Sequence, residues 1–177
     1  MWEQIRHTYA RAQFFGAVGN QVKKWLLTPE PSLAAQNIGF IRLACELMGF
    51  RREFRLSSSH PSRLRRSHRA LDLLRWCEAD WYLSAHGAFA YMSSDGVFPV
   101  PDIEAVFQDF KPKPYPQTCA TGQFVPFLSI LDALMNVGPA GTLELVSQGT
   151  ERWLTWEEMV ARSRSHQPEA RPEDELS

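Results

Sequence analysis

Tyr115-Pro-Gln-Thr-Cys-Ala-Thr-Gly-Gln-Phe-Val-Pro-Phe-Leu-Ser-Ile-Leu-Asp-Ala-Leu-Met-Asn-Val-Gly138 joins a proline-punctuated loop to a short apolar helix. From Pro126 to Val137 apolar residues cover nearly the whole circumference of that helix, which predicts burial on most sides. Ser129, Asp132 and Asn136 are the exceptions. Their spacing of three and four residues places them one above the other in a single polar stripe.

The polar stripe has two interpretations. It is either the narrow solvent face of an amphipathic helix that stops at Gly138 and Pro139, or the lining of a site. The second interpretation gains weight if the helix is buried, because an unpaired buried carboxylate is costly and needs partners, water or a ligand. The residues of the stripe alone do not decide between them.

The whole-chain composition is that of an ordinary globular protein. The 177 residues are 44% hydrophobic and carry 19 basic against 20 acidic side chains, so no nucleic-acid partner is expected. We expect one domain over residues 1–164 and a disordered tail over residues 165–177, which are polar, acidic and broken by prolines.

The cysteines and the N-terminus indicate a reduced, cytoplasmic compartment. Cys45, Cys77 and Cys119 are odd in number and far apart, which argues against a disulfide framework or structural zinc. Residues 1–8 lack the basic-then-apolar order of a signal peptide, and no uninterrupted apolar run approaches the length of a membrane span. The five histidines are scattered, so the sequence predicts neither a metal site nor another cofactor.

Periodicity and turn residues predict an α/β domain with about five helices around a small, partly parallel sheet. The expected helices cover residues 3–27 (with a break near Gly16 and Gly19), Ser32 to Gly49, a segment after residues 62–69, 88–92, 126–137, and Thr155 toward Arg164. The expected strands cover residues 53–56, 81–84, 103–110 and 142–146.

Two further groups carry candidate chemistry. Arg63, Arg65 and Arg66 crowd at a probable helix start, where free backbone amides and guanidinium groups hold a phosphate or carboxylate; the alternative is a solvated basic surface. His86 follows a strand, a common place for a general acid or base, although a histidine there can also simply hydrogen-bond within the turn. Cys119, in the loop before the central helix, is a weaker nucleophile candidate.

Three stretches, in this order and spacing, resemble the WbqC-like family of bacteria. They are Tyr82-Leu-Ser84 through Gly87 to Tyr91, Tyr115-Pro-Gln117 with Phe124-Val-Pro126, and Leu128 to Asp132 continuing through Asn136-Val-Gly138. The similarity covers roughly residues 30–140. The family is associated with genes for O-antigen and other surface polysaccharides, and a transferase role for glycine or another amino acid has been suggested for its members.

The resemblance implies one site and a role for each candidate residue. Asp132 would orient or deprotonate an amine or hydroxyl, with Ser129 and His86 as further catalytic candidates. The substrate implied is a nucleotide- or lipid-linked amino sugar. Its binding residues would be Tyr82, Ser84, Gly87, Tyr91, Tyr115, Gln117 and Asn136, with Arg63, Arg65 and Arg66 meeting a phosphate.

The sequence departs from the family pattern in two places. Ala85 and His86 stand where the family tends to have glycine followed by a small residue or proline. The Gln-Pro and aromatic-rich segment that opens family members has no counterpart before Trp2, so the chain is expected to be the C-terminal portion of the family's length. Surface exposed by that truncation would favour self-association. The alternative function is then a non-catalytic remnant that binds a sugar or a partner chain.

Overall fold

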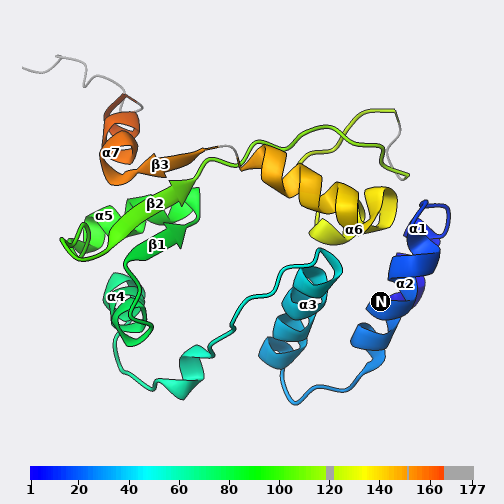
Figure 1. Ribbon diagram of the computed structural model, residues 1–177, viewed down its shortest axis with the longest axis horizontal. Helices are drawn as coiled ribbons and strands as arrows, with labels where there is room; N and C mark the ends of the chain where they lie inside the picture. Colours follow the sequence, from blue (N-terminus) through cyan, green and yellow to red (C-terminus); the bar gives the residue numbers. More distant parts are fainter. Residues whose placement is uncertain (119–121, 151, 166–177) are drawn as a thin grey trace, which may run out of the picture. The chain divides into compact units, whose positions relative to one another are not determined.

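The computed structural model describes residues 1–118, 122–150 and 152–165, which form seven α-helices and one three-stranded mixed sheet (Figure 1). The α/β class and the parallel strand pair are confirmed. The chain divides into two compact units. Unit 1 comprises Met1–Phe54 and Lys111–Glu151, and unit 2 comprises Arg55–Phe110 and Arg152–Ser177. The boundaries of the predicted domain, residues 1–164, stay a prediction.

Unit 1 begins with three helices, α1 (Trp2–Tyr9), α2 (Phe15–Leu27) and α3 (Leu33–Leu47). The expected break in the first helical region exists, but it lies before Gly16, which is inside α2 with Gly19. The predicted cap of α3 is confirmed, because the Ser32 side chain accepts a hydrogen bond from the Ala35 amide at 3.1 Å.

The fourth helix of unit 1, α6 (Ile130–Gly149), is later and longer than predicted. Ser129 is its N-cap, whereas Phe127 and Leu128 precede the helix and are exposed, so their predicted burial is wrong. Gly138 does not end it: φ of 73° and ψ of 177° kink the chain there, and a second helical segment follows Pro139. Proline is well tolerated in a first helical turn, so the strand predicted at residues 142–146 is helix instead.

One apolar core holds unit 1 together. Val18 and Val22 of α2 pack with Leu134 and Met135 of α6, and with Ala44 of α3 and its C-cap residue Met48. The amide of Phe14 donates to the Met135 carbonyl at 3.0 Å, which ties the α1–α2 connection to α6. The first half of α6 is therefore fixed on its apolar side, and its polar side chains turn toward the preceding loop.

Unit 2 is built on a sheet ordered β1-β2-β3, with β1 (Trp81–Ser84), β2 (Glu104–Gln108) and β3 (Trp153–Thr155). The first pair is parallel, with Trp81 opposite Glu104, and the second is antiparallel, with Gln108 opposite Trp153. The strands expected at 81–84 and within 103–110 are confirmed. The strand expected at 53–56 is wrong, since those residues are irregular; two apolar residues in alternation do not make a strand without a neighbour to pair with.

Helices surround this sheet. They are α4 (Arg66–Trp76), α5 (Phe89–Asp95) and α7 (Trp156–Ser165), with the short 3₁₀ turns η1 (Ser57–Ser59) and η2 (His86–Ala88). The core joins Phe89 and Met92 of α5 to Phe107 of β2 and Leu154 of β3. The predicted capping box is confirmed: the Thr155 amide donates to Glu158 Oε2 at 2.9 Å and the Glu158 amide to Thr155 Oγ1 at 3.3 Å.

Two sequence expectations concern the C-terminal tail and membrane-spanning segments. Ser165, assigned to the disordered tail, is the last residue of α7, and the rest of that tail lies outside the described residues. In the parts of the chain that the structure covers, every helix is too short or too polar to cross a membrane.

Candidate functional site

The predicted site residues divide between the two units. Unit 1 holds Tyr115, Gln117, Ser129, Asp132 and Asn136. Unit 2 holds Arg63, Arg65, Arg66, Tyr82, Ser84, His86, Gly87 and Tyr91. The expectation that all of them border a single site stays a prediction, and the two groups are described separately.

Asp132 is the centre of the unit 1 group. It is 1% exposed, and both side-chain donors that reach it in the described residues bind the same oxygen, Oδ2. The Tyr115 phenol donates at 2.7 Å and the Gln117 amide nitrogen at 3.3 Å. Asn136 is also buried, at 6%. The solvent-face interpretation is therefore wrong for Asp132 and Asn136, which meet the loop instead of water.

The Gln117 side chain connects the loop residues on either side of the central part of the loop. Its Oε1 accepts from the Val125 amide at 2.8 Å, and its Nε2 donates to the Val125 carbonyl at 2.9 Å, so the side chain pairs with both backbone groups of one residue. The neighbouring Phe124 ring packs edge-on against Tyr115, with 5.4 Å between centroids. The two halves of the loop are thus joined beside Asp132.

Asn136 continues the same contact one helical turn later. Its Oδ1 accepts from Thr118, from the amide at 2.9 Å and from Oγ1 at 2.5 Å, while its Nδ2 donates to the Asp132 carbonyl at 2.9 Å. Thr118 was missed by sequence reasoning. Its one signal is its place directly after Gln117, and nothing in the residue type shows that its hydroxyl turns toward the helix.

Ser129 differs from the other members of the stripe. It is exposed and caps α6, with its Oγ accepting from the Leu131 amide at 3.3 Å and its carbonyl from the Asp132 amide at 2.8 Å. This cap places Asp132 in the first turn of α6, where the positive end of the helix dipole stabilises a carboxylate.

Tyr115 is held in its neutral form. Partial burial is the main cause that raises its pKa to about 12, and the hydrogen bond to Asp132 with the charge of that carboxylate acts in the same direction, whereas the contact with Gln117 opposes it. The phenol therefore keeps its proton and remains a donor to Asp132 at neutral pH.

In unit 2 the tyrosines and Ser84 lie around β1 and α5. Ser84 is buried with its Oγ 4.0 Å from the Met92 sulfur, and Tyr82 packs on Phe98 with centroids 5.8 Å apart. Tyr91 is partly exposed; burial, and next the nearby Tyr82, raise its pKa. Tyr82 and Tyr91 are therefore neighbours.

The arginine-rich helix start of unit 2 already holds a carboxylate. Asp95 Oδ2 accepts from the amide and hydroxyl of Ser67 at 3.2 and 2.8 Å and from Arg66 Nε at 3.1 Å. The Ser67 hydroxyl is the main cause that lowers the pKa of Asp95. The predicted anion position at this helix is thus filled from within the chain, at the end of α5. Arg63 and Arg65 are exposed beside it.

His86 and Gly87 are exposed at the carboxyl end of β1, and both border a groove that α7 closes on the other side. The described residues contain no cluster of three or more His, Cys, Asp or Glu side chains that would hold a metal ion. Cys119 lies outside the described residues.

The model of the WbqC-like protein family matches residues 1–144. The chain belongs to this family. The match begins before the resemblance noted in the sequence, at residue 1 instead of about residue 30. It includes all members of the Asp132 cluster, which are Tyr115, Gln117, Thr118, Asp132 and Asn136. It ends within α6, so β3 and α7 lie beyond it. No match to a curated protein or to a solved structure was found. The expected missing N-terminal half stays a prediction.

Proposed function

We propose that this member of the WbqC-like family is a transferase of surface-polysaccharide biosynthesis that moves an amino-acid or other acyl group to the amine of a nucleotide- or lipid-linked amino sugar. Family membership supports the biological setting. The observation that carries the chemistry is the buried Asp132 carboxylate, 2.7 Å from the Tyr115 phenol, on the segment that the family model matches.

An acyl transfer of this kind needs a proton acceptor. The amine nitrogen forms a bond to the acyl carbon, the bond from that carbon to its leaving group breaks, and the amine gives up a proton. A carboxylate that is 1% exposed does not meet a substrate directly, whereas Tyr115 and Gln117 are only partly buried. The amine proton therefore passes to the Tyr115 oxygen while the phenol proton moves to Asp132 Oδ2.

The same burial favours one alternative, a protein that binds a sugar without turnover. In this alternative the carboxylate only holds Tyr115 and Gln117 in place, since both side chains donate to Asp132 Oδ2. In that case the amide and phenol at the edge of the cluster hydrogen-bond sugar hydroxyls, and no group is transferred.

The test is turnover by matched variants. Wild-type protein is incubated with a panel of nucleotide-linked amino sugars and acyl or aminoacyl donors, and acylated sugar products are detected by mass spectrometry. Asp132→Asn and Tyr115→Phe should each lower kcat at least tenfold, and Glu144→Gln, an exposed change on the same helix, should not. Sugar binding without any product would establish the alternative; full activity in Asp132→Asn would refute the role of that residue.

A further inference from the structure

A groove in unit 2 is separate from the Asp132 cluster. It has a volume of about 380 Å³ and lies between the η2–α5 segment and α7. His86 and Gly87 line one side and Met159, Arg162 and Ser163 line the other. It sits where β1 ends, and ligands of α/β proteins bind at the carboxyl ends of parallel strands. One wall comes from α7, which is outside the family match.

The floor of the groove is apolar and its mouth is open. Phe89 and Met159 belong to the core of the unit and line the groove. A Cβ built on Gly87 would meet no atom within 4 Å, so the absence of a side chain there leaves space. The volume falls in the lower part of the range for small-molecule sites, roughly 300–1,000 Å³.

The charged or titratable groups that line the groove are the Arg162 guanidinium and the His86 imidazole, while the Ser163 hydroxyl donates to the Val160 carbonyl at 3.0 Å. Arg162 donates from Nη2 to Asp109 Oδ2 at 3.2 Å and from Nη1 to Oδ1 at 3.4 Å, and its side chain is 41% exposed. Asp109 therefore fixes the orientation of the guanidinium, which lowers the entropy lost when a ligand binds. The pKa of nearby Glu158 is lowered mainly by the Thr155 amide and by its ion pair with Arg152, and the charge of Arg162 adds to the same shift.

We infer that this groove binds a small organic anion with a compact apolar body, such as an aromatic or short acyl carboxylate or sulfonate. The apolar body rests on Phe89 and Met159, and the anionic group meets Arg162 and His86 at the rim. A neutral ligand of the same shape gains only the apolar contact. The groove shares no residue with the Asp132 cluster, so this inference stands whether or not the transferase proposal holds.

Two fluorescent probes differ only in the relevant charge. 1-Anilinonaphthalene-8-sulfonate carries a sulfonate on the aromatic body of N-phenyl-1-naphthylamine, and both become fluorescent in apolar surroundings. Binding of each is titrated on the full chain. Gly87→Leu adds a side chain at a residue that lines the groove, where a Cβ would meet no atom within 4 Å, and should weaken binding of the sulfonate probe at least tenfold. A wild-type chain that does not bind the sulfonate probe, or a Gly87→Leu variant that binds it unchanged, would overturn the inference.

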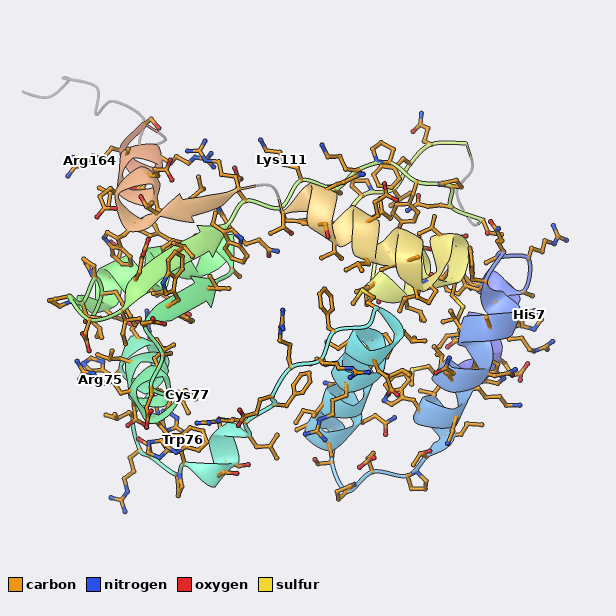
Figure 2. The ribbon with its side chains drawn as sticks, in the orientation of Figure 1. His7, Arg75, Trp76, Cys77, Lys111 and Arg164 are labelled. Atoms are coloured by element: carbon orange, nitrogen blue, oxygen red, sulfur yellow. The ribbon has the colours of Figure 1, made fainter. Side chains whose placement is uncertain are left out.

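The charge is tested by a matched pair of arginine changes on α7. Arg162→Gln should reduce the preference for the sulfonate over the neutral probe at least fivefold. Arg164→Gln, two residues further along the helix and labelled in Figure 2, does not border the groove and should leave that preference unchanged. Circular dichroism confirms that both variants are folded. If Arg162→Gln has no effect on the preference, or if Arg164→Gln has the same effect, the groove does not recognise anions through Arg162.

Discussion

The Tyr115 phenol donates a hydrogen bond to Asp132 Oδ2 at 2.7 Å, and this contact joins a proline-rich loop to the first turn of a buried helix. Asn136 repeats the contact one turn later through Thr118. Asp132 and Asn136 of α6 thus both accept hydrogen bonds from the loop. Two members of the predicted stripe, Asp132 and Asn136, therefore connect the helix to the loop, whereas Ser129 caps the helix.

The first prediction concerns the titration of Tyr115. Because its pKa is raised to about 12, the folded state keeps the phenol proton at a pH where the unfolded state has lost it. The stability from this group is thus complete below pH 10 and is lost as the pH rises toward 12. Tyr115 is only partly buried, so solvent screening reduces the loss to about 1 kcal/mol.

The measurement is absorbance at 295 nm, which follows tyrosine ionisation in a chain with four tyrosines. Tyr115→Phe should remove the latest step of the titration. Asp132→Asn removes a charge and should move that step to lower pH, while Glu144→Gln leaves it in place. A late step that survives in Tyr115→Phe would belong to another tyrosine and would contradict the prediction.

The second prediction is that Asn136→Ala destabilises the fold by about 1 to 2 kcal/mol. Removing the buried Asn136 amide takes away the acceptor of two Thr118 donors. Urea unfolding followed by tryptophan fluorescence measures this. Gln148→Ala, an exposed change on the same helix, should stay within about 0.5 kcal/mol of wild type. Equal stabilities for the two variants would show that the Thr118 contact contributes nothing.

Local signals predicted the elements that depend on local chemistry. Ser32 before an apolar helix, and the Thr155 and Glu158 capping box, identified two helix starts because each cap uses groups within one turn. The strands at 53–56 and 142–146 were wrong for the opposite reason. Strand formation depends on a neighbour elsewhere in the chain, and the preference of a proline for a helix start decided the second of them.

For the candidate site, the sequence indicated individual residues but not their hydrogen-bond partners. The stripe pointed to Asp132 and Asn136, but their partners follow from how the loop folds back, which residue types do not encode. The basic helix start predicted a bound phosphate or carboxylate, and that ligand stays a prediction; the structure places a carboxylate of the chain itself against Arg66 and Ser67. That this carboxylate is that of Asp95, separated from Ser67 by 28 residues, required the tertiary structure.

A third prediction follows from the lowered pKa of Asp95, which the Ser67 hydroxyl and amide and the Arg66 charge hold below its ordinary value of 3.8. In acid the unfolded state takes up the proton first, so the stabilisation is present above that value and is lost as the pH falls through the lower, folded one. Asp95→Asn keeps an acceptor for Ser67 but cannot titrate. Its stability should fall less between pH 5 and pH 2 than that of wild type.

Thermal unfolding across that pH range is the appropriate measurement. Asp102→Asn serves as the control, because Asp102 is exposed and its ion pair with Arg75 Nε is long, at 3.8 Å. This variant should follow the wild-type curve. Parallel curves for Asp95→Asn and wild type would mean that the Asp95 carboxylate does not contribute to acid sensitivity.

The last prediction tests why α6 needs glycine at its kink. Gly138 has φ of 73°, and a Cβ there would lie 2.6 Å from the ring of Phe14. Gly138→Ala therefore adds backbone strain to a steric clash, and should destabilise the protein by about 2 to 4 kcal/mol in urea unfolding. Gly16→Ala is the matched control, since its Cβ would meet no atom within 4 Å inside α2; it should be neutral or stabilise by up to about 1 kcal/mol.

A double variant separates the two causes. Phe14→Ala removes the ring, so adding Gly138→Ala to it should cost only the strain of the left-handed backbone, about 1 kcal/mol, instead of the full penalty. The difference between the two backgrounds then measures the clash. If Gly138→Ala costs as much without the ring as with it, the close approach of Phe14 is not a reason for glycine at this position, and backbone conformation alone explains it.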